Sequence, residues 1–242
     1  MAMHKDFPPS PHEILKPNVR WFPADETLRD TSYEKLMPPL VPELRQKVFE
    51  WRNNGYPDVS DTSRTLLNWW FKTPHPIPHA DGTIGNFEYY FAQRESVETV
   101  IYLHEFVKVK DKYDLLRFDT RGVVPPKLIE ETWRRYVVKM ATGSGKTKTM
   151  GLLLAWSYFH KKYEEDSDLS KNFLVIAPNI IVLDRLRTDF DGLKIFSEDP
   201  VLPDNGSDGR NWRSDFQLTL HIQDEVGPLN SNGNICLLYT SD

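Results

Sequence analysis

The sequence predicts an α/β fold in which helices flank a parallel sheet, and three observations lead to this prediction. A short apolar run at residues 173–177 is followed by an amphipathic helical stretch at 179–190. A longer apolar helical stretch at 146–163 precedes both, and another short apolar run at 136–140 precedes that helix. Strand, helix, strand and helix therefore follow one another, and this order requires parallel strands joined by helical crossovers.

The first 86 residues are predicted to form a proline-rich, mainly helical extension of short pieces joined by extended linkers. Twelve of the 18 prolines precede residue 80, and proline disfavours helix both at its own position and at the one before it. Two helices are still expected, one at residues 42–54 and one that follows Asp61 as its N-cap. The second helix carries Trp69 and Trp70, which we expect in the core or at an inter-domain contact rather than as a platform for stacking bases.

Residues 87–109 are predicted to form one long helix. Apolar side chains recur there near the 3.6-residue period, at Phe91, Val97, Ile101 and Phe106. A short helix at 127–133 should then lead into the strand at 136–140, and alternation at 216–222 marks a further strand candidate.

Composition excludes several classes of protein. Apolar residues make up 39% and charged residues 27%, ordinary usage that argues against global disorder. No run of 18 apolar residues predicts a membrane span, and no apolar stretch near the start predicts a secretory signal. Cys236 is the single cysteine, so a reducing cytoplasm fits best. With a net charge of −5, any nucleic acid would be held through local contacts.

The strongest chemical signal lies between the strand at 136–140 and the helix at 146–163, where the sequence reads Met-Ala-Thr-Gly-Ser-Gly-Lys-Thr. Gly143 and Gly145 allow a tight turn whose N–H groups point into one concavity, and the helix N-terminus adds positive charge there. Lys146 would reach the β- and γ-phosphates and act as the catalytic residue, while the Thr147 hydroxyl would ligate Mg²⁺. The residues expected to hold ATP are Thr142, Gly143, Ser144, Gly145, Lys146 and Thr147. The pattern departs from the phosphate-loop consensus at Met140, where Gly is usual, and a glycine-rich turn before a basic helix start is the alternative.

These residues, preceded by Lys139 and Met140, resemble motif I of superfamily 2 helicases and translocases. Within that group they look like the restriction-subunit branch of DEAD/DEAH-box-type motors, found in type III and type I restriction enzymes, where Met before the Ala is common. The resemblance implies an incomplete RecA-like P-loop NTPase domain that uses ATP and Mg²⁺.

A second resemblance lies about 40 residues upstream, where Phe-Ala-Gln-Arg-Glu-Ser-Val-Glu-Thr at residues 91–99 is similar to the Q motif. The resemblance implies that the Gln93 amide hydrogen-bonds the edge of adenine, since an amide can donate and accept at once. A solvated Gln on a helix surface is the alternative.

Downstream, residues 176–183 look like motif Ia, which tracks the nucleic-acid backbone in this superfamily. By this resemblance Asn179 and the amides of the following helix would meet a phosphate, and Arg185 or Arg187 would add positive charge. Alternatively, Arg187 could pair with Asp184 on the helix surface.

A motor of this superfamily also needs an Asp-Glu-x-His or Asp-Glu-x-Asp strand end, which the sequence does not contain. The pair Asp224-Glu225 is expected to be a surface turn. We therefore expect residues 1–86 to be an extension and residues 87–235 the first part of motor domain 1, truncated before Walker B. Residues 236–242 are expected to be a non-native tail.

Two further clusters carry weaker signals. Prolines between His75 and His79 prevent the helix that would bring both rings to a metal. Basic residues near the phosphate loop could form a local positive patch, namely Arg134, Arg135, Lys139 and Lys148. Arg134 and Arg135 could instead pair with the acidic residues 130 and 131.

The resemblance implies the restriction subunit of a type III-like restriction–modification system. Such a protein would translocate on double-stranded DNA, lie in the cytoplasm, and associate with a modification methyltransferase. Two alternatives stay open: a superfamily 2 helicase of DNA repair or RNA metabolism without a nuclease, and a scaffold that binds nucleotide without hydrolysing it.

Overall fold

The computed structural model describes residues 10–19, 23, 25–124, 135–223 and 227–240. Contacts divide the chain into two compact units. Unit 1 comprises Met1–Val59 with Tyr89–Ser144, and unit 2 comprises Ser60–Glu88 with Gly145–Asp242. Each unit therefore combines a segment of the proline-rich extension with a segment from beyond residue 86.

In its described residues, unit 1 contains helices and turns but no strand. Its elements are η1 (Glu26–Leu28), α1 (Tyr33–Leu36), α2 (Val41–Asn53), α4 (Phe91–Ile101), the π-helical turn η2 (Tyr102–Phe106) and α5 (Lys112–Leu116). The expected helix at 42–54 is confirmed as α2, and its residues Val48 and Trp51 lie in the core.

A buried carboxylate joins α2 to α4. Glu98 has no solvent exposure, and its Oε2 accepts hydrogen bonds from two nitrogens of Arg52, one of them at 2.7 Å. Its Oε1 accepts from the Tyr56 hydroxyl at 2.6 Å and from Nε of Arg94 at 2.8 Å. A buried charge is tolerated only when it is paired and hydrogen-bonded, and here both oxygens are. Burial, followed by the charge of Glu98, raises the pKa of Tyr56 well above its ordinary value, so this hydroxyl stays a donor.

The expected long helix at 87–109 is shorter and is interrupted. α4 begins only at Phe91, whose N–H donates to the carbonyl of Pro11 at 2.8 Å. Its helical hydrogen bonding changes register at Tyr102, where η2 begins, and Phe106 on that turn is 38% exposed. The apolar period predicted the buried residues Phe91, Val97 and Ile101 but could not predict the change in hydrogen bonding. The helix expected at 127–133 lies outside the described residues.

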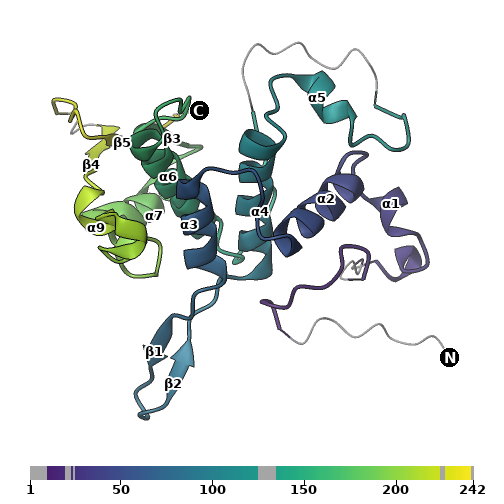
Figure 1. Cartoon of the computed structure of the whole chain (residues 1–242), viewed down its shortest axis with the longest axis horizontal. Helices are drawn as coiled ribbons and strands as arrows, with labels where there is room; N and C mark the ends of the chain where they lie inside the picture. Colours follow the sequence, from purple (N-terminus) through teal and green to yellow (C-terminus); the bar gives the residue numbers. More distant parts are fainter. Residues whose placement is uncertain (1–9, 20–22, 24, 125–134, 224–226, 241–242) are drawn as a thin grey trace. The chain divides into compact units, whose positions relative to one another are not determined.

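Unit 2 contains the strands. Its elements are α3 (Asp61–Phe71), β1 (Pro76–Pro78), β2 (Ile84–Asn86), α6 (Lys146–Tyr163), β3 (Asn172–Ala177), α7 (Ile180–Phe190), η3 (Asp191–Leu193), α8 (Lys194–Ser197), η4 (Ser207–Gly209), α9 (Trp212–Asp215), β4 (Thr219–Ile222) and β5 (Asn234–Tyr239). β1 and β2 pair as an antiparallel hairpin that extends from the C-terminal end of α3, where extended linkers were expected (Figure 1). Among the described residues, no helix combines the length and apolarity that a bilayer crossing requires.

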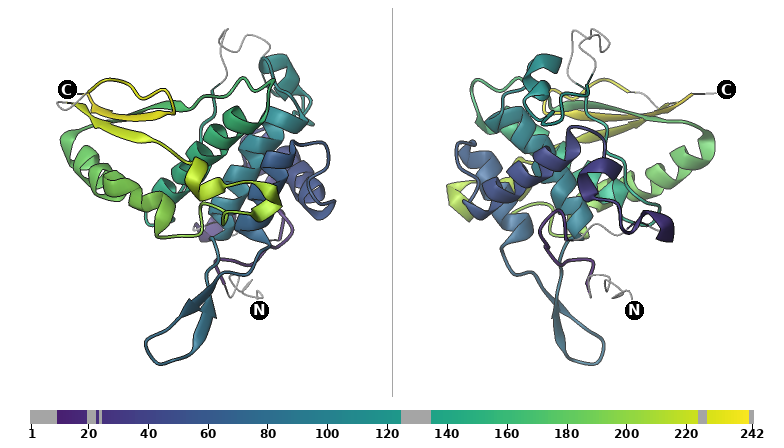
Figure 2. Two further views of the ribbon diagram at one scale, coloured as in Figure 1. Left: turned by 60° about the vertical axis from the view of Figure 1, so that its left-hand side comes forward. Right: turned by 90° about the vertical axis from the view of Figure 1, so that its right-hand side faces the viewer.

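Three parallel strands form the sheet, in the order β3-β5-β4. α7 packs against β3 and β5 (Figure 2). This mixed α/β arrangement, with helices flanking a parallel sheet, is that of a partial RecA-like domain and confirms the predicted fold class. β3, α6 and α7 follow the expected ranges closely, and β4 is the C-terminal part of the strand expected at 216–222.

The strand expected at 136–140 is wrong. Residues 135–141 belong to no helix or strand, and the Val137 side chain is 93% exposed. A strand requires a neighbour that accepts and donates its backbone hydrogen bonds, and the described part of unit 1 contains no strand that could pair with this segment.

β5 lies at the centre of the sheet, although residues 236–242 were expected to be a non-native tail. Leu237 of this strand is fully buried, and Cys236 and Leu238 pair in register with Leu174 and Ile176 of β3. Leu174 and Ile176 are themselves more than half exposed, at 58% and 57%. These residues therefore have the β-strand pattern that the sheet needs, whatever the origin of the tail.

α3 begins with a different cap from the one expected. Ser60, not Asp61, is the N-cap, and its hydroxyl oxygen accepts the Ser63 N–H at 3.1 Å. As expected, Trp70 lies in the core, with 2% of its surface exposed.

We expect Arg52→Met to lower the free energy of unfolding by about 3 kcal/mol, because it removes a partner of a buried carboxylate. Lys47→Met is the matched control, since it removes ion pairs with Glu43 and Glu50 on the exposed surface of the same helix and should change stability little. Chemical denaturation of both variants measures the difference. Equal stability of the two variants would contradict the assigned role of Glu98.

Candidate phosphate-binding site

Two glycines give the turn before α6 its backbone shape. Gly143 has a φ of 79° and Gly145 a φ of 81°, the left-handed region that other residues adopt at a cost. Between them, Ser144 donates both its N–H, at 3.4 Å, and its hydroxyl, at 2.7 Å, to the carbonyl of Ala141. Gly143 and Gly145 therefore occupy the positions at which the turn requires glycine.

α6 then starts in a manner suited to an anion. Gly145 is its N-cap residue and has no side chain with which to cap it, and no acidic residue lies in its first turn. Such a helix end presents backbone N–H groups and a partial positive charge. Lys146 is exposed and Thr147 is half-buried at the first two helical positions.

The rest of α6 is anchored in the core of unit 2. Leu152, Ala155 and Phe159 are fully buried along it. Trp156 donates its indole N–H to the Ser63 hydroxyl of α3 at 2.7 Å. Gly151 approaches α8 closely, since a Cβ there would lie 3.1 Å from the side chain of Ile195. The helix that begins at the loop is thus held by contacts along its length.

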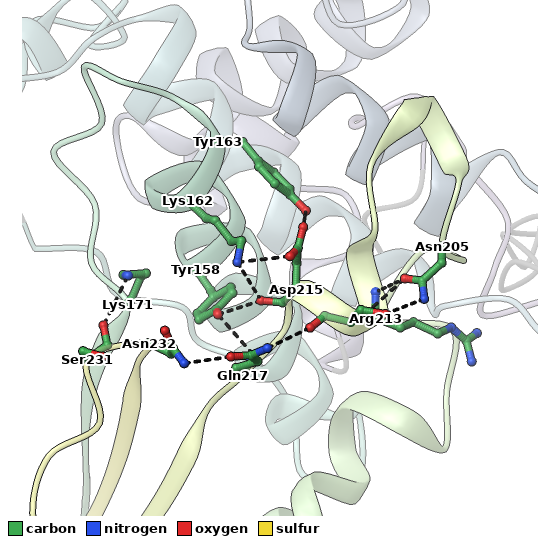
Figure 3. Close-up of polar contacts among 11 residues, drawn as sticks. Tyr158, Lys162, Tyr163, Lys171, Asn205, Arg213, Asp215, Gln217, Ser231 and Asn232 are labelled. Carbon is green, nitrogen blue, oxygen red and sulfur yellow. Dashed lines mark hydrogen bonds and ion pairs between the residues drawn. The ribbon is translucent and has the colours of Figure 1, made fainter.

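A polar cluster fixes the C-terminal part of α6 (Figure 3). The Tyr163 hydroxyl donates to Oδ2 of Asp215 at 2.8 Å, and the Lys162 ammonium lies 3.3 Å from Oδ1 of the same residue. Tyr158 donates its hydroxyl to the Asp215 carbonyl at 2.8 Å and accepts the Gln217 N–H at 3.1 Å. Burial, followed by the hydrogen bond to Asp215, raises the pKa of Tyr163 above its ordinary value. This cluster could not be predicted from the sequence, because Asp215 is more than 50 residues from Tyr158, Lys162 and Tyr163.

Lys148, expected in a positive patch, is paired with an acidic residue. It forms an ion pair with Asp199, which follows α8 by two residues. Burial lowers the pKa of Lys148, and the nearby charges of Glu198 and Asp189 act in the opposite direction. Sequence reasoning did not identify Asp199, because the two residues of the pair lie 51 positions apart. Arg134 lies outside the described residues.

Gln93 lies in unit 1, on the first turn of α4, and only 4% of its surface is exposed. Its Oε1 accepts the Tyr90 N–H at 2.8 Å, so the side chain caps its own helix. Lys146 belongs to unit 2, because the division between the units falls between Ser144 and Gly145. The solvated Gln considered as an alternative does not agree with this burial.

The residues expected at the nucleic-acid backbone are spread along α7, from its N-cap to its last turn. Asn179 is the N-cap of this helix, and its Oδ1 accepts the Val182 N–H at 3.0 Å. Arg185 and Arg187 are exposed on the helix that follows. All three belong to unit 2, as does Lys146.

The remaining candidates add no site. Asp224-Glu225, expected as a surface turn, lies outside the described residues. Nε2 of His75 lies 2.7 Å from the carbonyl of Trp69. The described residues contain no group of three or more His, Cys, Asp or Glu side chains that could hold a metal ion.

Comparison with known proteins gives one match. The family described as "Type III restriction enzyme, res subunit" matches residues 87–225, which is more than half of the chain. The match starts where the sequence predicts that the extension ends, and it includes the phosphate-loop residues and the start of α7. Neither the curated proteins nor the solved structures provide a match.

We expect Gly143→Ala to destabilise the chain by about 1 kcal/mol, because a Cβ is disfavoured at this positive φ. No atom lies within 4 Å of where that Cβ would be, so steric crowding adds nothing. Gly143→Asn is the matched control, since Asn tolerates the left-handed region better. Thermal unfolding of the two variants measures the difference, and a more stable Ala variant would contradict the loop geometry.

Proposed function

We propose, because the chain belongs to the family of type III restriction enzyme res subunits, that it is the nucleotide-binding part of a DNA translocase in a restriction–modification system. The family is one of ATP-dependent, helicase-like motors. The observation that carries the proposal is the turn with two glycines at positive φ, which leads into α6. This helix has a glycine as its N-cap, and Lys146 and Thr147 are its first two residues. ATP with Mg²⁺ is the ligand this arrangement suits.

In this proposal the loop residues Thr142 to Gly145 surround the phosphates, and the Ser144 N–H exchanges its bond of 3.4 Å to the Ala141 carbonyl for a phosphate oxygen. Lys146 neutralises charge on the β- and γ-phosphates, and Thr147 supplies one oxygen ligand to Mg²⁺. A compact, flexible ammonium suits a phosphate as a point charge, and the exposed position of Lys146 leaves its side chain room to reach the phosphates.

Gln93 would select adenine. Its Oε1 already accepts the Tyr90 N–H, so the amide group is held in a fixed orientation at the start of α4. An oriented amide distinguishes the donor and acceptor edge of adenine from that of guanine better than a mobile one.

DNA would bind along α7, from Asn179 at its start to Arg187 in its last turn. A helix N-terminus and two exposed arginines suit phosphate oxygens, and such contacts carry no sequence information. A modification methyltransferase as partner subunit and a cytoplasmic location are parts of the same proposal. A repair or RNA helicase of the superfamily would use the same nucleotide site.

A scaffold that binds nucleotide without turnover is the second candidate function. One observation favours it: the sequence has no Asp-Glu-x-His or Asp-Glu-x-Asp to hold Mg²⁺ and orient the attacking water. The chain as given should therefore hydrolyse ATP slowly. Phosphate release that double-stranded DNA stimulates in the complete protein identifies a motor, and its absence identifies the scaffold.

We expect Lys146→Ala to abolish ATP-dependent activity of the complete protein while leaving DNA binding largely intact. The substitution removes the positive charge that neutralises the phosphates, and it leaves the arginines of α7 unchanged. Lys194→Ala is the control, since Lys194 is an exposed lysine of the same unit and pairs with Asp191. Phosphate release and binding of a labelled ATP analogue measure the effect. Nucleotide binding by Lys146→Ala at the wild-type level would refute the site.

We expect Arg185→Gln and Arg187→Gln each to weaken DNA binding similarly for all sequences. Each should also lower the salt dependence of the affinity by about one unit of slope for every phosphate contact removed. Arg213→Gln on α9 is the control, because Arg213 is also an exposed arginine of unit 2 and lies away from α7 in the sequence, where it pairs with Asp204. Titration of DNA at several salt concentrations measures the slope, and three identical slopes would contradict the assignment.

A further inference from the structure

The first turn of α6 carries two lysines, and the structure treats them differently. Lys146 is exposed, whereas Lys148 forms an ion pair with Asp199. The side chain of Asp199 is 14% exposed, compared with 69% for Asp191 in its pair with Lys194. Water therefore screens the carboxylate of Asp199 less than that of Asp191, while the two lysines are similarly exposed, at 44% and 50%.

The segment that carries Asp199 is itself fixed to α3. Trp69 donates its indole N–H to the carbonyl of Pro200 at 2.8 Å, and Trp70 donates to the carbonyl of Val201 at 2.7 Å. The Val201 N–H in turn donates to the Asp199 carbonyl at 2.7 Å. Two bulky indoles, one of them in the core, therefore hold the two residues that directly follow this carboxylate.

The electrostatics of a helix start explain why this matters. Lys146 and Lys148 place two positive charges at the end of α6 that is already positive, and no acidic residue of the first turn offsets them. Asp199 supplies that negative charge from another segment. The charges of Glu198 and Asp189 also act on Lys148.

We propose that Asp199 is a positioning residue for the phosphate loop: by holding Lys148 it fixes the first turn of α6, and with it Lys146 and Thr147. This inference rests on the proposed nucleotide site. It assigns a role in that site to α3 of the proline-rich extension, through the two tryptophans and Asp199.

The experiment measures binding of a fluorescent, non-hydrolysable ATP analogue to the 242-residue chain. We expect Asp199→Asn to weaken binding about tenfold, because loss of the pair frees the first turn. Asp199→Glu keeps the charge and should retain most of the affinity. Asp191→Asn, which removes the exposed pair of the same type, should bind as the wild type does.

A double-mutant cycle separates positioning from a general structural effect. Lys148→Met alone should also weaken binding, and adding Asp199→Asn to Lys148→Met should have no further effect. If the two changes add fully, Asp199 acts through its loop and the inference is wrong. Wild-type binding by a folded Lys148→Met overturns it as well, and this variant serves if Asp199→Asn fails to fold in a thermal melt.

The result for Lys146→Ala distinguishes the two proposals. If this variant binds the analogue as the wild type does, the nucleotide site itself is wrong. If it loses binding while Asp199→Asn and Lys148→Met keep theirs, the site stands and the positioning role of Asp199 fails.

Discussion

The attachment of α6 to three distant segments is the constraint on which the rest of unit 2 depends. Asp199 holds the first turn, Ser63 of α3 holds the middle, and Asp215 holds the end. Burial of apolar side chains alone would keep this helix against the core. It would still allow the helix to slide along its axis or rotate about it, since the hydrophobic effect has no direction. The polar contacts set its position along its axis, and the loop that precedes it inherits that position.

The sequence predicted best those elements whose cause is local. The bounds of α6 follow from a glycine at its start and an apolar face that continues for 18 residues, and both are visible in the chain itself. Asn179 at the start of α7 is a capping residue in sequence and in structure. Residues 136–140 have the composition of a strand as well, but a strand also needs a partner, and partners are a property of the fold.

The candidate site was predictable to a similar degree. The two glycines and Lys146 could be found because their spacing is the signal. Asp199 and Asp215 could not, because a single carboxylate in a loop looks the same whether it faces solvent or a lysine 51 residues away. Glu98 is the clearest case in unit 1. Arg52 belongs to the predicted extension of residues 1–86 and Glu98 to the segment that follows, yet the two form a buried ion pair. The extension therefore shares its core with the segment that matches the family, and removing it would leave a charge buried without its counter-ion.

The indole hydrogen bonds of Trp69 and Trp70 also make the protein its own optical probe. Both rings donate to carbonyls next to Asp199, and indole emission changes in wavelength and intensity when such a bond or its surroundings change. A ligand that shifts the start of α6 would transmit the shift to these rings through one ion pair and two peptide units. Intrinsic fluorescence can thus follow events at the loop with no label attached, in a chain that has seven tryptophans and in which each could be replaced by Phe to identify the source of the signal.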